Sequence, residues 1–290
     1  MPTGKGRRGA VGNGRPMAAP NLKAIIILSA FIIFHAAASF AAQAQPAPDV
    51  WVTQPWIAAM ARFIAVSTLN VRPMCAWGGD GSLRIIRRPP RGATVIALDT
   101  KDADKYGLRS GRYGLHLMYE HLPIADLYRN AIQFDPSMLP FMSQRLLVIL
   151  SKLNQDNYSF YQRRLAEFQS RVESTVEVGR SQIRGVKMLD LAGAVSPWIE
   201  AAATDAVRPP PEVWAAWAKG ERADELLAAV TSAQNRGWWI VTDTWTPARI
   251  AAAAASAPRK VKITPSDANQ DLFEYLQDIY LQMWNVMAKR

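Results

Sequence analysis

One uninterrupted amphipathic stretch, residues 154–184, constrains the fold more than any other part of this sequence. Its apolar side chains recur at steps of three and four residues, which places them on one stripe of a helix. They are Tyr161, Leu165, Phe168, Val172 and Val176. No proline or glycine occurs before Gly179, so the helix can exceed about 20 residues, or roughly 30 Å. Asn154 or Asp156 is expected to cap its start, and Gly179 or Gly185 to end it. We predict a long helix that links two halves of the chain.

Strand and helix signals alternate on both sides of this stretch. The β-branched run at residues 93–98 (ATVIAL) is typical of a strand buried in a parallel sheet. After the linking helix, predicted strands at residues 185–189 and 237–242 are each followed by a helical segment. The sequence therefore predicts an α/β fold with two βα lobes of parallel strands, at residues 45–153 and 185–290, joined by the long helix.

Four other segments have weaker signals. Residues 70–77 are expected to be extended, with Pro73 excluding a fully paired central strand. Residues 116–129 are expected to be irregular or partly helical, and the run 207–211 (VRPPP) is interpreted as a linker. Thr246 is expected to cap a helix whose first residue is the proline that follows it.

Residues 1–44 have the composition of a secretory signal peptide. Their five basic residues have no acidic counterpart. An apolar core follows at residues 24–34 (AIIILSAFIIF), and the tripeptide Ala-Gln-Ala at residues 42–44 fits a small-residue cleavage site. A membrane-spanning helix would need about 20 apolar residues, more than this core provides. We therefore expect cleavage of residues 1–44 and a periplasmic location for the mature protein.

Charge and motif content narrow the class of protein. Without the five basic leader residues the formal net charge falls from +10 to +5, and no basic cluster is interleaved with aromatic residues, so we expect no nucleic-acid partner. Cys75 is the single cysteine, which excludes an intramolecular disulfide. No G-x-S-x-G, H-E-x-x-H or C-x-x-C motif and no phosphate-binding glycine loop is present. We therefore expect that the protein is not an enzyme.

The most distinctive stretch begins at residues 134–136 (FDP) and continues, after a helical segment, at residues 150–168 (LSKLNQDNYSFYQRRLAEF). It resembles the pattern W-L-D-P … L-x-x-x-D-P-x-N-x-x-x-Y-x-x-N-x-x-x-F of the solute-binding proteins of zinc and manganese ABC importers. Asn157, Tyr161 and Phe168 stand at matching positions, and Asp156 lies next to Asn157. The resemblance implies two lobes on a rigid helical backbone with a ligand cleft between them. It also implies zinc or manganese as the transported ligand and an ABC permease in the inner membrane as the partner.

The metal site of this family consists of four groups, mostly histidines with a carboxylate, on loops at strand ends. The turn that would carry the first histidine corresponds to residues 78–82 (GGDGS), which contain none. The position of the second is Ala131, that of the third falls near Asp190, and that of the fourth is Thr264. The resemblance therefore implies the fold and one metal ligand of four.

Four residues are the candidate metal ligands of this chain. Zinc takes about three protein ligands of the nitrogen, sulfur or oxygen type plus a fourth group. Asp190 and Asp243 each end a predicted strand, which is where the ligand crevice of an open parallel sheet lies. His116 and His121 could converge from a loop. The alternative is that all four are ordinary loop histidines, turn residues and helix caps.

Aromatic residues also gather near predicted strand ends. The chain has 10 tryptophans, and walls built from them suit an organic or cationic ligand. Trp77, Asp80 and Trp245 are the candidate ligand-binding residues, with core packing as the alternative for the two tryptophans. Met74 and Cys75 form a soft pair that suits Cu(I), or else a buried pair within the core.

We therefore expect a monomeric periplasmic solute-binding protein of an ABC importer, which takes a divalent metal ion or a metal-related solute. One alternative is an accessory or interaction protein that kept the fold and lost the site. Another is a receptor for an organic cation or a metal chelate. These functions differ in whether Asp190, Asp243 and the two histidines converge on one cleft.

Overall fold

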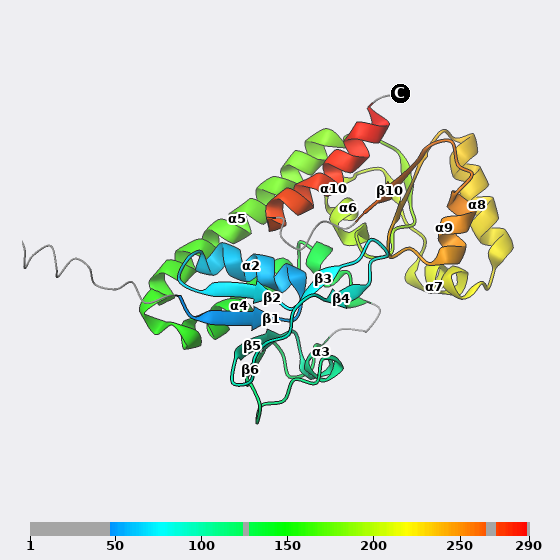
Figure 1. Cartoon of the computed structure of the whole chain (residues 1–290). Helices are drawn as coiled ribbons and strands as arrows, with labels where there is room; N and C mark the ends of the chain where they lie inside the picture. The colour runs from blue at the N-terminus through cyan, green and yellow to red at the C-terminus, as the bar shows by residue number, and fades with distance from the viewer. Residues whose placement is uncertain (1–46, 124–127, 265–270, 289–290) are drawn as a thin grey trace, which may run out of the picture. The chain divides into compact units, whose positions relative to one another are not determined.

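The computed structural model describes residues 47–123, 128–264 and 271–288 (Figure 1). They form an α/β structure with two four-stranded parallel sheets and a long helix, which confirms the predicted fold class. The predicted leader, residues 1–44, lies outside the described residues, and its cleavage stays a prediction, as do the residue bounds predicted for the two halves. No helix of the described residues is both long enough and apolar enough to cross a membrane.

The first sheet is built from the N-terminal half, and its four strands run parallel. In spatial order they are β2 (Asn70–Pro73), β1 (Asp49–Val52), β5 (Thr94–Ala97) and β6 (Gly114–Leu117). The central strands β1 and β5 are largely buried, as their β-branched residues predict. Pro73 ends an edge strand, where a missing N–H costs no bond to an inner neighbour.

The expectation for residues 116–129 is wrong at its start, because His116 and Leu117 belong to strand β6. This strand is short, lies at the edge of the sheet and is only half-buried. Its sequence (GLHL) therefore lacks the continuous apolar run that identifies β5.

The remaining elements of the N-terminal half surround this sheet. They are α2 (Pro55–Ala65), the antiparallel hairpin of β3 (Cys75–Trp77) and β4 (Leu83–Ile85), α3 (Thr100–Lys105), the 3-10 turn η2 (Ile132–Phe134) and α4 (Leu139–Leu153). Helix α2 starts at Pro55, whose fixed φ and missing N–H suit a first helical position.

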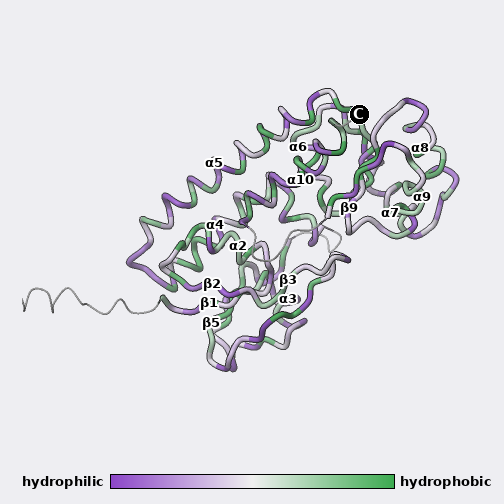
Figure 2. The backbone as a smooth tube through the Cα atoms, turned by 45° about the horizontal axis from the view of Figure 1, so that its top comes forward, coloured by the Kyte–Doolittle hydropathy of each residue, from purple (hydrophilic) through white to green (hydrophobic). Residues whose placement is uncertain are grey.

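The predicted linking helix is confirmed as α5 (Tyr158–Gln182), which follows the 3-10 turn η3 (Gln155–Asn157). All five residues of the predicted stripe are buried, and Figure 2 shows polar and apolar residues alternating along this helix. Full burial of such a side chain is worth about 1.5–3 kcal/mol. The predicted caps are wrong: Asn157 is the N-cap residue, and its side chain makes no capping bond.

Gly179 does not end the helix but lies inside it. A Cβ atom at this position would come within 2.3 Å of the ring of Tyr280. Tyr280 belongs to α10 (Leu272–Met287), which lies along α5 (Figure 1). The glycine is therefore required by the close approach of these two helices, a contact between distant segments that no helix-ending rule includes.

The second sheet is also parallel and is built from the C-terminal half. In spatial order its strands are β10 (Lys260–Ile263), β9 (Trp239–Asp243), β7 (Met188–Asp190) and β8 (Ala206–Val207). The helices of this half besides α10 are α6 (Ser196–Ala202), α7 (Pro211–Lys219), α8 (Ala223–Asn235) and α9 (Ala248–Ala254).

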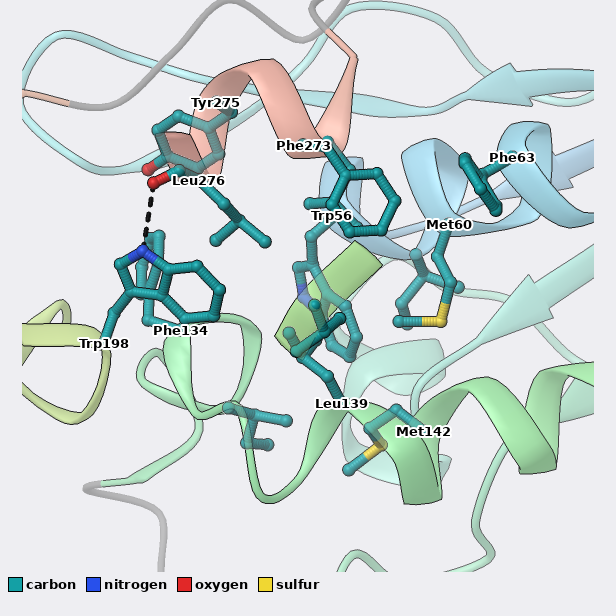
Figure 3. Close-up of a cluster of buried hydrophobic side chains, with 14 of the residues drawn as sticks. Trp56, Met60, Phe63, Phe134, Leu139, Met142, Trp198, Phe273, Tyr275 and Leu276 are labelled. Carbon is teal, nitrogen blue, oxygen red and sulfur yellow. Dashed lines mark hydrogen bonds between the residues drawn. The ribbon is translucent and has the colours of Figure 1, made fainter. Parts of the chain in front are cut away.

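One large hydrophobic cluster includes residues of both sheets and of helices α2, α4, α5 and α10. Figure 3 shows part of it, where the indole N–H of Trp198 donates to the carbonyl oxygen of Leu276 over 3.0 Å. The hydroxyl of Tyr280 donates to the carbonyl oxygen of Trp198 over 2.7 Å, and the two rings stack. These bonds satisfy the polar atoms of two large buried aromatic residues, as burial requires.

Candidate solute-binding site

Asp190 ends strand β7 and is completely buried. Its carboxylate accepts hydrogen bonds from the N–H of Ala192 over 2.9 Å, from the hydroxyl of Ser196, and from Nη1 of Arg208 over 3.2 Å. The same Nη1 donates to the carbonyl oxygen of Ala192 over 2.9 Å. Burial raises the pKa of Asp190 above its ordinary value, although Arg208 and the two hydrogen-bond donors oppose that shift. This carboxylate is already paired and hydrogen-bonded within the chain.

Asp243 ends strand β9, the neighbour of β7. Its carboxylate accepts from three successive N–H groups of the loop after β7, and also from the hydroxyl of Thr246 over 2.9 Å. The three donors are Gly193 at 2.9 Å, Ala194 at 2.7 Å and Val195 at 3.0 Å. The hydroxyl of Thr246 is therefore bonded to Asp243 and does not cap a helix. Its predicted role as a helix cap is wrong, because Pro247 is the N-cap residue of α9. Asp243 holds the loop that leads into α6.

The first sheet ends in a second network of acids. Asp99 is the N-cap of α3, where its carboxylate accepts from the N–H of Asp102 over 2.8 Å, and it also pairs with Arg129. Burial alone would raise the pKa of Asp99, but the bonds from Arg129 and from the Asp102 N–H hold it below its ordinary value. Asp102 accepts from Thr53, from Gln54 over 2.6 Å and from the N–H of Leu98 over 3.1 Å. Burial raises the pKa of Asp102 despite these donors.

The two histidines lie in the other half of the chain from Asp190 and Asp243. His116 is half-buried in β6, and its pKa is lowered by burial and by the charge of Lys152. His121 is exposed in the turn after β6. Asp126, which the sequence places near them, lies outside the described residues. Within the part of the chain that is described, no three His, Cys, Asp or Glu side chains are grouped as a metal site requires. The four candidate ligands therefore stay a prediction, with Asp190 and Asp243 on neighbouring strands.

Trp77 and Trp245 contact each other, with ring centroids 5.3 Å apart in an edge-to-face arrangement. The indole N–H of Trp245 donates to the carbonyl oxygen of Gly81 over 2.9 Å. Asp80 organises its own turn by accepting from the N–H of Ser82 over 3.1 Å and from its hydroxyl over 2.7 Å. These bonds, and one from Arg84, lower the pKa of Asp80 to about 2. The two tryptophans join the β3–β4 hairpin to the loop after β9, and their predicted contact with a ligand remains untested.

Met74 and Cys75 are buried in a smaller hydrophobic cluster, which also includes Trp51 and Val95 of the first sheet and Tyr106. Burial raises the pKa of the Cys75 thiol. A thiol kept protonated is a poor metal ligand, so this environment favours the interpretation of the pair as core residues.

A cavity of about 360 Å³ is lined by residues from both halves of the chain, and the sequence did not predict it. Its walls include Tyr128, Ala131, Ser196, Glu200, Arg208 and Trp214. The prolines that follow Arg208 also line it, so the run interpreted as a linker is a wall of this cavity. The available signal was an arginine before three prolines and then a tryptophan in a short helix. Two of the wall residues, Ser196 and Arg208, are the partners of Asp190.

Comparison with solved structures identifies the fold. The crystal structure of ZnuA superimposes with a TM-score of 0.58 at 15% identity, covering 83% of this chain and 99% of that one. A Mn-bound periplasmic metal binding protein from candidatus liberibacter asiaticus, an S38A mutant, gives a TM-score of 0.55 at 12% identity over 82% of this chain and 98% of that one. A Cd-bound structure of the protein from that organism gives 0.55 at 10% identity, with 82% and 98% covered. Protein-family models and curated proteins gave no match. The chain has the fold of these periplasmic metal-binding proteins.

Proposed function

We propose that this chain, which has the fold of the periplasmic metal-binding proteins, is a periplasmic solute-binding protein of an ABC importer. It binds a solute in the cavity beside Arg208 and delivers it to a permease in the inner membrane. The observation that carries this proposal is the composition of the cavity wall. The wall includes Ala131, the position at which the resembling family has a metal-binding histidine. It also includes Ser196 and Arg208, whose side chains bond to Asp190.

Transport follows from such a site if the solute contacts both halves of the chain and favours the arrangement that the permease recognises. Tyr128 and Ala131 come from the segment before α4, whereas the other walls come from the C-terminal half. The long helix α5 contacts α2, α4, α6 and α10 and so restricts large movements. Ligand binding is therefore expected to cause small shifts of loops, and the protein acts by binding and not by catalysis.

The residues around the cavity do not fit a free zinc or manganese ion. Asp190 is neutralised by Arg208, Asp243 is occupied by three backbone N–H groups, and position 131 is an alanine. A divalent ion would have to displace Arg208 from a completely buried carboxylate and leave that guanidinium beside a second positive charge. The solute that we propose is therefore organic, or a metal that arrives with ligands of its own.

A direct test is to purify the mature protein from periplasm without chelator and to measure bound metal by mass spectrometry and the thermal midpoint with zinc and manganese. A ligand at 100 times its dissociation constant adds about 2.7 kcal/mol of stability. We expect less than stoichiometric metal and no shift with either ion. One equivalent of zinc or manganese, together with a shift that Asp190→Asn abolishes and the exposed control Asp104→Asn retains, would restore the free-ion receptor.

The second candidate is an accessory protein that kept the fold without a transported solute. The contact of Trp77 with Trp245 favours this second candidate, because the contact fixes the β3–β4 hairpin of one half to the loop after β9 in the other half. Deletion of the gene separates the two functions: a receptor is required for uptake of a specific solute, whereas an accessory protein is not.

A further inference from the structure

The cavity beside Arg208 is lined by one acidic and one basic side chain, of which only the arginine is bonded within the described part of the chain. Glu200 lies on α6 and is exposed. Its carboxylate has no ion pair or hydrogen bond with any of the described residues. Arg208 lines the same cavity, and its side chain is 25% exposed. The cavity therefore offers one free anionic group and one accessible cationic group.

The guanidinium of Arg208 has capacity for a further acceptor. Both of its bonds within the described part of the chain go through Nη1, to Asp190 and to the carbonyl oxygen of Ala192. Nη2 and Nε retain three N–H donors, because a guanidinium carries five in a fixed fork. These donors match the planar oxygens of a carboxylate. Asp190 holds the guanidinium in place, as a ligand-binding arginine requires.

Aromatic and proline side chains form the apolar part of the wall. The guanidinium carbon of Arg208 lies 5.8 Å from the ring centroid of Trp214. The indole nitrogen of Trp214 is buried and has no hydrogen-bond partner within the described residues, which is unusual for a buried polar atom. Tyr128, which comes from the segment before α4, also lines the cavity, and its side chain is about half-exposed. Such walls accept the apolar part of a small organic molecule.

We propose that this cavity binds a small amphoteric solute, whose carboxylate pairs with Arg208 and whose ammonium group pairs with Glu200, as in an α-amino acid or a short peptide. The volume of about 360 Å³ lies at the lower end of the range for small-molecule sites. This inference rests on the proposed function and specifies its solute.

The placement of charged groups on the wall, and not its net charge, favours this class over simple ions. The charge of Arg208 is already balanced by Asp190, so Glu200 leaves the wall with one excess negative charge. A simple anion would be repelled by Glu200, and a bare cation would meet the uncommitted donors of Arg208. A molecule that carries both charges places its ammonium group at Glu200 and offers its carboxylate oxygens to the remaining N–H donors of Arg208.

The test uses the mature chain and three sets of probes in calorimetry and thermal-shift assays. The first set is the common α-amino acids and their dipeptides, the second is carboxylic acids of matched size without an amine, and the third is amines without a carboxylate. We expect binding in the first set alone. Glu200→Gln should weaken that binding about tenfold or more, because it removes a charge-assisted bond. The exposed Glu173→Gln on α5 is the matched control and should bind as the wild type does.

Arg208→Met alone would leave Asp190 buried and unpaired, so its partner is changed with it. The double variant Asp190→Asn/Arg208→Met removes both charges, and we expect it to fold and to lose binding of the first set. Equal affinity of wild type and Glu200→Gln for every amphoteric probe, or binding of none of them, would overturn the proposed solute class. If the amphoteric probes fail but deletion of the gene still abolishes uptake of another solute, the receptor function stands and only this inference falls.

Discussion

The indole N–H of Trp245 donates to the carbonyl oxygen of Gly81, although 164 positions separate the two residues in sequence. Gly81 has a φ of +75°, and a Cβ atom there would come within 2.9 Å of the indole nitrogen. Only glycine combines this backbone conformation with so close an approach. The bond joins the β3–β4 hairpin of the N-terminal half to the loop after β9.

Replacing Trp245 by phenylalanine should lower the free energy of unfolding by about 1 kcal/mol or more, because the bond to Gly81 is lost while a ring remains beside Trp77. Urea denaturation measures the change. Trp238→Phe is a matched control, since its indole makes no hydrogen bond with the described residues. Equal stability losses in the two variants would show that the bond to Gly81 contributes nothing.

Gly179→Ala should destabilise the protein, although alanine normally stabilises a helix interior by about 0.5–1 kcal/mol relative to glycine. The new methyl group would overlap the ring of Tyr280, and overpacking of this kind costs about 1–3 kcal/mol. Tyr280→Leu is the second arm of a double-mutant cycle: in that background the alanine should lose most of its cost. Gly111→Ala is the control, because no atom lies within 4 Å of its Cβ position. Additive effects of the two core changes would contradict the proposed overlap.

The elements that the sequence predicts well are those determined by local periodicity. The buried stripe from Tyr161 to Val176 needs only the repeat of a helix, and the run that forms β5 needs only its β-branched residues. Gly179 and strand β6 depend on neighbours that are distant in sequence, so local rules misassign them. The pairing of Asp190 with Arg208 is of the same kind, because it joins a strand end to a segment that resembles a linker. The cavity could not be predicted for this reason, whereas the acids at the strand ends could.

Arg208→Met should lower the free energy of unfolding by about 3–5 kcal/mol, since it leaves a completely buried carboxylate without its charged partner. The double variant Asp190→Asn/Arg208→Met should recover much of that loss, because neither charge remains. Thermal and urea unfolding both measure the effect. A double variant no more stable than Arg208→Met would indicate that the arginine stabilises the fold through its contact with Trp214 and not through Asp190.

Asp99 and Asp102 should make opposite contributions to the pH dependence of stability, although both belong to one network. The pKa of Asp99 is held below its ordinary value of 3.8, mainly because Arg129 and a backbone N–H outweigh the effect of burial. Its contribution to stability is therefore present above pH 3.8 and is lost as the pH falls through the lower, folded-state value. Burial raises the pKa of Asp102 above 3.8, so its contribution is present below that pH and is lost as the pH rises through the folded-state value.

Asparagine is uncharged at every pH, so Asp99→Asn and Asp102→Asn each remove the pH dependence of stability that the replaced carboxyl group contributes. Relative to the wild type, Asp99→Asn should lose stability progressively as the pH rises through the region below 3.8, while Asp102→Asn should recover stability as the pH rises above 3.8. The slope of each difference can reach about 1.4 kcal/mol per pH unit for one proton. Urea unfolding from about pH 3 to pH 7 measures both slopes, and the slope is the quantity to compare because each substitution also changes hydrogen bonds at every pH. Slopes of the same sign for both variants would contradict the prediction. Burial would then not be the dominant effect on the pKa of Asp102, or Arg129 would not be the decisive partner of Asp99.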